Sequence, residues 1–193
     1  MSTYHQAGLL LSAAHESHFP PDQGAEVAIA GRSNAGKSSA LNALTGRRAL
    51  ARISKTPGRT RLLNFFELTP GRRIVDLPGY GYAAVSAEER ASWESMTTAL
   101  SQRDSLRGLF LVVDSRRGVH ARDEELIAWA SLADCPVHVL LSKADKLKRA
   151  ELNRTLAAAQ HGLEGSATVQ AFSAVDGTGL EQARSQLNQW LKK

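Results

Sequence analysis

The stretch from Gly31 to Ser38 reads GRSNAGKS and matches the pattern G-x-x-x-x-G-K-[ST]. Glycines let such a loop curl so that backbone N–H groups point at phosphate oxygens, and the helix start that follows adds partial positive charge. Lys37 is expected to reach the β- and γ-phosphates, and the Ser38 hydroxyl to ligate magnesium. The expected phosphate contacts are Gly31, Arg32, Ser33, Asn34, Ala35, Gly36, Lys37 and Ser38.

The alternative is a glycine-rich turn that binds nothing. A predicted strand precedes the loop and a predicted helix follows it, which favours nucleotide binding. The loop by itself does not distinguish ATP from GTP.

A second motif, DLPG, begins at Asp76, 39 residues after Lys37 and directly after a predicted strand. An aspartate there is well placed to hold a magnesium-bound water, and Gly79 offers a backbone N–H and freedom to move beside a γ-phosphate. Alone, D-x-P-G is an ordinary turn. After a phosphate loop at this distance it indicates a nucleotide-state switch, with Asp76, Leu77, Pro78 and Gly79 as nucleotide contacts.

Thr60 lies in the basic connection before the next strand and is expected to add a second hydroxyl to the magnesium shell. Thr56 is the rival candidate; Thr60 is preferred because it lies nearer the strand and follows a flexible Pro-Gly. The predicted metal ligands are thus Ser38 and Thr60, and the predicted catalytic residues are Lys37 and Thr60, with no side-chain general base. The nucleotide contacts expected here are Gly58, Arg59, Thr60, Arg61 and Leu62.

The base is expected to be read by SKAD, at Ser142, Lys143, Ala144 and Asp145. The carboxylate of Asp145 can accept hydrogen bonds from guanine N1–H and the 2-amino group, a pair that adenine lacks, while Lys143 lays its stem along the purine face. Phe172, Ser173 and Ala174 follow the last predicted strand and can present a backbone N–H to guanine O6. SKAD alone is a common polar loop, but the four motifs in this order predict GTP over ATP.

Each motif needs a strand end to position it. Continuous apolar runs predict buried parallel strands, and the Thr69-Pro70-Gly71 turn predicts one antiparallel hairpin. The strands are expected at 26–30, 61–68, 73–75, 108–113, 137–141 and 169–172, and the helices at 37–45, 122–133 and 180–191. The predicted fold is an α/β domain with a mostly parallel six-stranded sheet, one antiparallel strand and helices on both faces. Ligands of such sheets bind at the carboxyl ends of the strands.

A chain of 193 residues fits a single domain over 1–193, with residues 1–24 as an extension packed on or beside it. No apolar run approaches the ~20 residues of a membrane helix, so no membrane partner is expected. The first residues lack the basic start of a signal peptide. The single cysteine, Cys135, rules out an internal disulfide framework and suits the cytoplasm; it is expected at a buried strand start.

The net charge of +5 is unevenly placed. Residues 46–73 hold eight basic side chains and one acid, Glu67, whereas the remaining chain holds 16 basic and 18 acidic groups. This basic segment is either a solvated loop or a contact with nucleic acid or another polyanion, and charge alone does not decide between them.

Together GRSNAGKSS, SKTPGRT, NFF, DLPGYGYA and SKAD resemble the EngB (YihA/YsxC-type) GTPases of bacteria over nearly the whole chain. The resemblance implies an α/β Ras-like P-loop GTPase domain, slow GTP hydrolysis, a cytoplasmic location and a role in large ribosomal subunit assembly. It also implies a link to division-septum formation, which would follow from ribosome supply. One departure is Ser142, where the family usually has Thr or Asn; nucleotide affinity would differ modestly and guanine choice would not.

Tyr80 stands where Ras-type enzymes carry a water-orienting glutamine, which predicts slow hydrolysis. The missing charge could come from Arg59 or Arg61, although these are more simply RNA-facing or solvated. It could also come from K⁺ held by Asn34, which resembles the asparagine of potassium-activated relatives but could equally be a structural loop residue.

Two functional classes remain open. One is a switch, expected to be a monomer, that binds GTP or GDP and contacts large-subunit rRNA through the basic segment. The other is a stand-alone enzyme or a protein-interaction switch without RNA.

Overall fold

The computed structural model describes residues 4, 6–47, 49–50, 62–80 and 87–192. Its strands are β1 (Gly8–Ala13), β2 (Ala25–Gly31), β3 (Leu63–Thr69), β4 (Arg72–Asp76), β5 (Leu106–Asp114), β6 (Val137–Ser142) and β7 (Thr168–Ala171). Its α-helices are α1 (Lys37–Thr45), α2 (Ala87–Ser101), α3 (Ala121–Leu132), α4 (Arg149–Gly162) and α5 (Leu180–Leu191). Two short 3₁₀ helices are η1 (Glu16–His18) and η3 (Ala144–Lys146).

The strands form one sheet in the order β1-β3-β4-β2-β5-β6-β7. The expectation of six strands was wrong by one, because residues 8–13 form β1 and pair with β3 at the edge of the sheet. The predicted single antiparallel strand is β3, which runs opposite to both of its neighbours. Since β4 and β5 flank β2 on opposite sides, the chain reverses its direction of winding there, and a crevice is expected outside the carboxyl end of β2.

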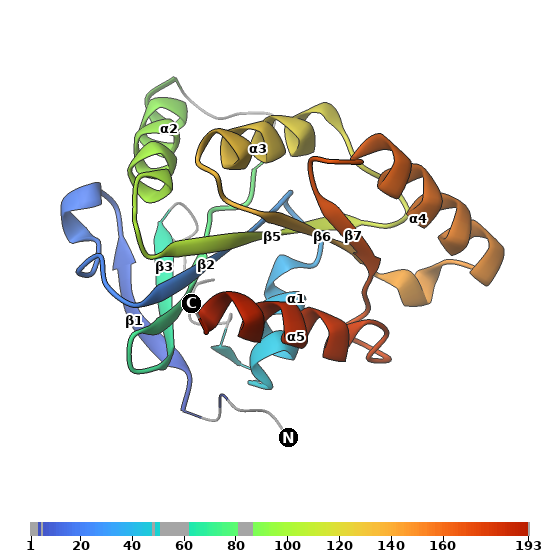
Figure 1. Cartoon of the computed structure of the whole chain (residues 1–193), viewed down its shortest axis with the longest axis horizontal. Coiled ribbons are helices and arrows are strands. Elements are labelled where there is room, and N and C mark those ends of the chain that lie inside the picture. The colour runs from blue at the N-terminus through green and yellow to red at the C-terminus, as the bar shows by residue number, and fades with distance from the viewer. Residues whose placement is uncertain (1–3, 5, 48, 51–61, 81–86, 193) are drawn as a thin grey trace.

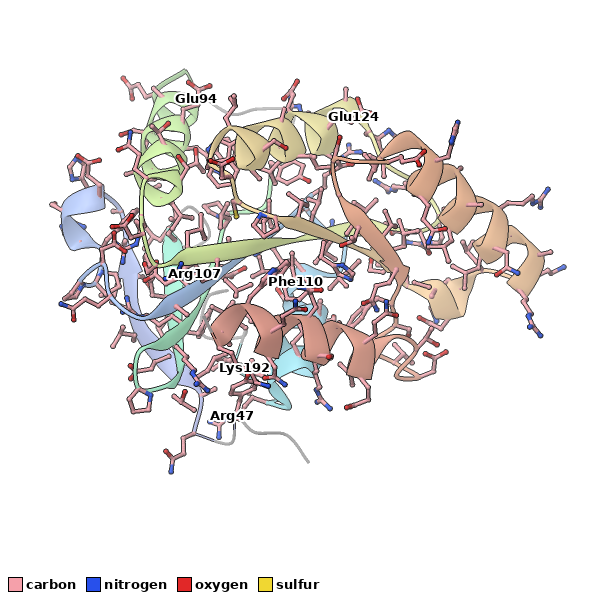
Figure 2. All side chains as sticks on the ribbon, in the orientation of Figure 1. Arg47, Glu94, Arg107, Phe110, Glu124 and Lys192 are labelled. Carbon is pink, nitrogen blue, oxygen red and sulfur yellow. The ribbon has the colours of Figure 1, made fainter. Side chains whose placement is uncertain are left out.

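Helices cover both faces of the sheet, as predicted (Figure 1). Residues of α1 and α5 share one buried cluster with Phe66, Phe110 and Leu140, and residues of α2, α3 and α4 share the other with Phe65. Phe110, a residue of β5, is buried in the core, whereas Glu94 and Glu124 lie on the outer sides of α2 and α3 (Figure 2).

The predicted bounds of α1 and α5 match the structure, and the central strands shift by one or two residues. The strand expected from Arg61 begins at Leu63, and Leu62 lies in a bend before it. Helix α4 was not expected, since it buries only Ala159. Cys135 is buried as predicted, and burial raises the pKa of its thiol to about 12. No helix among the described residues combines the length and apolar character needed to cross a membrane.

A buried ion network lies at the end of the sheet where β2 begins. The Glu26 carboxylate, which is fully buried, accepts from Arg73 at 2.6 Å and from Arg103 at 2.7 and 2.9 Å. Arg73 also donates to the carbonyl of Gln23, and Arg103 to that of Pro20. The network therefore ties residues 20–26 to β4 and to the turn before β5.

Candidate functional site

The phosphate loop leaves the carboxyl end of β2 and enters α1, as the motif requires. A Cβ on Gly31 would lie 2.6 Å from the Val112 carbonyl oxygen, so only glycine fits this close strand approach. Gly36 caps α1 with a φ of 101°, a left-handed value that disfavours other residues. The first backbone N–H groups of an α-helix have no partner within the helix, so with the helix dipole the start of α1 can bind an anion.

Lys37 and Ser38 begin α1, and Asp76 ends β4 beside them. The Lys37 ammonium forms an ion pair with the Asp76 carboxylate, and both side chains are largely buried. The hydroxyl of Ser38 and the carboxylate of Asp76 are hard oxygen donors, the type that Mg²⁺ prefers. The residues therefore fit a magnesium ion completed by phosphate oxygens and water.

The DLPG turn lies against the phosphate loop. The Leu77 N–H donates to the Ile29 carbonyl at 3.0 Å, and the Ser33 N–H donates to the Tyr80 carbonyl at 2.9 Å. An ideal Cβ on Gly79 would lie 3.6 Å from the Ser33 nitrogen. The segment from Asp76 to Tyr80 is thus docked along the loop that the sequence assigned to phosphate binding.

The Tyr80 side chain turns toward α3, where its hydroxyl donates to Asp123 at 2.5 Å. Burial raises the pKa of this hydroxyl far above its usual value, and the nearby Asp123 charge adds to the effect. The hydroxyl therefore stays protonated and donates. The other Asp123 oxygen accepts the His120 N–H at 2.9 Å, so the aspartate joins the DLPG segment to the start of α3.

The SKAD loop follows β6. The hydroxyl of Ser142 lies within hydrogen-bonding distance of the Ala35 carbonyl and 3.1 Å from the Val113 carbonyl. The Lys143 ammonium donates to the Asn34 carbonyl at 2.6 Å. Although the serine differs from the usual Thr or Asn, its hydroxyl bridges β5, β6 and the phosphate loop, so the missing methyl group does not cost this contact.

Asp145, in the SKAD loop, lies beside the loop that follows β7 and holds Phe172, Ser173 and Ala174. Its carboxylate accepts from the Ser173 hydroxyl at 2.7 Å and pairs with Lys146 at 2.9 Å. The Ser173 bond, and next the Lys146 bond, hold the pKa of Asp145 below its usual value. The Ala144 N–H donates to the Phe172 carbonyl at 3.1 Å, which joins the two loops, and Ala174 is exposed beside them. The carboxylate is therefore charged and held in place.

The expected contacts Gly58, Arg59, Thr60 and Arg61 lie outside the described residues, and so does the rival Thr56. The role of Thr60 as a metal ligand and catalytic residue therefore stays a prediction.

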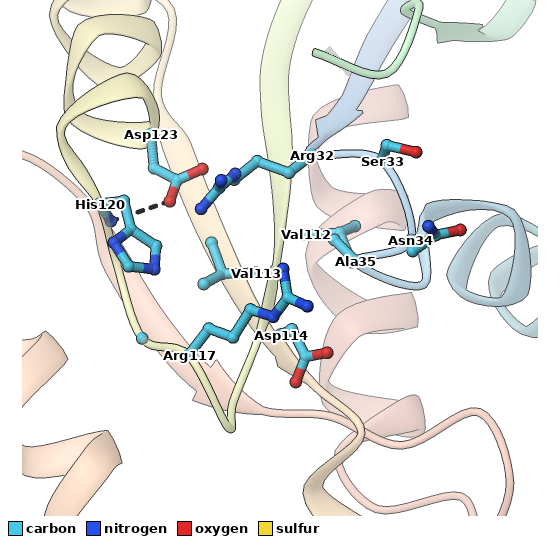
Figure 3. Close-up of a pocket in the computed structure, with 11 residues that line it drawn as sticks. Arg32, Ser33, Asn34, Ala35, Val112, Val113, Asp114, Arg117, His120 and Asp123 are labelled. Atoms are coloured by element: carbon cyan, nitrogen blue, oxygen red, sulfur yellow. Dashed lines mark hydrogen bonds between the residues drawn. The ribbon is translucent and has the colours of Figure 1, made fainter. Parts of the chain in front are cut away.

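A solvent-open pocket adjoins the phosphate loop at Arg32, Ser33, Asn34 and Ala35 (Figure 3). The side chain of Arg32 extends across it toward Asp123. Its walls also include Asp114, Arg117 and His120, which the motif search missed. For Asp114 a signal was present, because it ends an apolar strand just as Asp76 does.

A mainly parallel sheet of this order, carrying the GRSNAGKS loop, the DLPG turn and the SKAD loop at its carboxyl edge, is a P-loop GTPase domain. The family model described as "50S ribosome-binding GTPase" matches residues 26–143.

Curated proteins named "Probable GTP-binding protein EngB" extend the match to nearly the whole chain. The one from Idiomarina loihiensis is 50% identical, and one from Coxiella burnetii is 47% identical; each alignment covers 98% of this chain and 94% of the relative. The crystal structure titled "probable GTP-binding protein engB" superposes with a TM-score of 0.71 at 24% identity, covering 87% of this chain and 99% of the other. The chain belongs to the EngB family of GTP-binding proteins, and GTP hydrolysis is its activity.

Proposed function

We propose that this GTPase is a nucleotide-state switch in large ribosomal subunit assembly, with slow magnesium-dependent hydrolysis. The observation that carries the proposal is the meeting of three loops at one edge of the sheet. Ser142 and Lys143 bond the backbone of the phosphate loop, and Ser173 bonds Asp145. One rigid site can therefore read phosphates and base together.

In this proposal the backbone N–H groups of residues 31–38 hold the phosphates, and Asp145 and Lys143 hold guanine. Lys37 would exchange Asp76 for phosphate oxygens. Magnesium, held by Ser38 and Thr60 and through water by Asp76, would supply charge neutralisation at the β- and γ-phosphates. Binding the base through paired polar groups discriminates strongly between guanine and other bases, because a wrong base would leave acceptors of the site without a hydrogen-bond donor.

Slow hydrolysis is supported by the placement of Tyr80. Its hydroxyl is bound to Asp123 on α3, so it is occupied away from the phosphate loop. No side chain among the described residues is assigned as a general base. A partner or a cation must then provide the remaining stabilisation of transition-state charge.

Potassium is the cation we propose, with Asn34 as its protein ligand. Asn34 has a φ of 63°, and its carbonyl is held by Lys143, so the loop presents its side chain from a fixed backbone. We expect faster single-turnover hydrolysis in K⁺ than in Na⁺ buffer, by about tenfold if one stabilising charge is gained. Asn34→Ala should remove the difference while leaving the Na⁺ rate unchanged. Equal rates in both buffers would overturn the idea.

The ribosomal partner rests on the family description "50S ribosome-binding GTPase" and on the basic segment 46–73. Among the described residues of this segment, Arg73 is buried against Glu26 and does not face a partner. The other seven basic residues of the segment flank the proposed magnesium-sensing Thr60, so a partner bound there could sense the nucleotide state. We further propose that the protein acts in the cytoplasm as a monomer, and that effects on septation follow from ribosome supply.

Co-sedimentation with large ribosomal particles tests this assignment. Binding should weaken by roughly tenfold or more when the salt concentration is raised, and it should strengthen with a non-hydrolysable GTP analogue. Replacing Arg52 and Lys55 by glutamine should reduce both the binding and its salt dependence. Arg122→Gln with Arg154→Gln removes the same charge from exposed positions outside the segment and should change little. Co-sedimentation indifferent to salt and nucleotide would instead favour the stand-alone switch.

A further inference from the structure

Asp114 is the last residue of β5 and pairs in register with Ser142, the last residue of β6. Its side chain is only 6% exposed. The Arg116 guanidinium donates to both carboxylate oxygens, at 2.9 and 2.7 Å. The backbone N–H of Arg116 donates to one of the two oxygens at 3.1 Å. A buried carboxylate with this many donors is a fixed negative charge at the carboxyl edge of the sheet.

The same carboxylate accepts from the Lys143 ammonium at 2.8 Å. Since that ammonium also donates to the Asn34 carbonyl at 2.6 Å, one cation joins the end of β5, the SKAD loop and the phosphate loop. A lysine stem is flexible and its ammonium is a point charge, so two fixed acceptors are needed to hold it in one place. Asn34 supplies one of these acceptors and Asp114 the other.

We propose that Asp114 is a positioning residue for guanine nucleotide binding, acting through Lys143. It holds the ammonium against the phosphate loop, so that the stem of Lys143 is already extended where the purine face must lie. This inference rests on the base-reading role proposed for Lys143, and Asp114 itself touches no nucleotide.

The charge of Asp114 matters as well as its shape. Hydrogen bonds from Arg116, and next from Lys143, hold the pKa of Asp114 well below its usual range, so it remains ionised. An amide of the same size would place its NH₂ group against either the guanidinium or the ammonium, both of which are donors. Asp114→Asn therefore weakens the hold on Lys143, because at best an uncharged amide oxygen replaces the carboxylate, while the volume is unchanged.

The test is a double-mutant cycle on the whole protein, read as the affinity for a fluorescent GDP derivative with magnesium. Asp114→Asn and Lys143→Met should each weaken binding by about tenfold, the loss of one charge-assisted hydrogen bond or stacking contact. Together they should be no weaker than Lys143→Met alone, because Asp114 acts only through Lys143. A purely structural role for Asp114 would make the two losses multiply, and that result overturns the inference.

Separate outcomes identify which idea fails. A loss on Lys143→Met with Asp114→Asn unchanged overturns the positioning role alone. No loss on Lys143→Met overturns it together with the base-reading role of the lysine. If Asp114→Asn does not fold, Asp114→Glu keeps the charge but displaces it, and it should show an intermediate loss; normal affinity in that variant counts against the inference. Glu181→Gln removes an exposed carboxylate paired with Arg184, and it should leave affinity unchanged.

Discussion

Replacing Asp145 by alanine is expected to weaken GDP binding by about 10³-fold. Two charged hydrogen bonds to guanine would be lost, each contributing about 2 kcal/mol. The structure favours a large effect because Ser173 and Lys146 hold the carboxylate in place before any base arrives. Little stability should be lost, since the ion pair with Lys146 lies near the surface.

Calorimetric titration with GDP and with inosine diphosphate, which lacks the 2-amino group, would measure this effect. The natural protein should prefer GDP, and Asp145→Ala should bind both equally weakly. Asp176→Ala is the matched control: this carboxylate lies in the loop after β7 and accepts hydrogen bonds from Thr178 of the same loop. An Asp145→Ala protein that keeps its preference for GDP would place guanine recognition elsewhere.

Glu26→Gln should destabilise the fold by about 3–5 kcal/mol, because it removes the close counter-charge of two buried arginines, Arg73 and Arg103. Among the described residues, the counter-charge that Arg103 keeps is the more distant Asp22, at 3.9 Å. The two arginine side chains are 7% and 8% exposed, so water cannot replace the carboxylate easily. Urea unfolding should show a lower midpoint with an unchanged slope. In a chain of this size the melting temperature should fall by roughly 10 °C.

The comparison variant is Glu181→Gln, whose carboxylate pairs with Arg184 on the surface of α5. Its cost should stay within about 0.5 kcal/mol. The folded fraction of Glu26→Gln should bind GDP normally, because the network lies where β2 begins and the phosphate loop lies where β2 ends. Equal stability of the two variants would show that the buried network contributes no more than a surface pair.

Local patterns predicted the central sheet because its strands are continuous apolar runs, and predicted α1 and α5 because each has a clear apolar stripe. The edge strand β1 was not predicted, because its run GLLLSA is short and half-exposed. It forms a strand by pairing with β3, which the local pattern does not show. Helix α4 was not predicted for a similar reason, since Ala159 is its one buried residue.

The motifs named the residues that could touch phosphate and base, but not the side chains that hold them. Lys143 was expected to lie along the base; its bonds to Asn34 and Asp114 depend on strands that lie far apart in the chain and meet only in the sheet. The contact of Tyr80 with Asp123 likewise spans 43 residues. Such partners follow from topology and cannot be deduced from spacing along the chain.

The ion pair of Lys37 with Asp76 has a consequence for how ligands arrive. In the proposed site a triphosphate would compete with Asp76 for the lysine, and a divalent cation would compete with Lys37 for the aspartate. Whichever ligand binds first would leave an uncompensated charge that attracts the other. The two ligands would then be thermodynamically linked, and each should raise the affinity of the site for the other by the same factor.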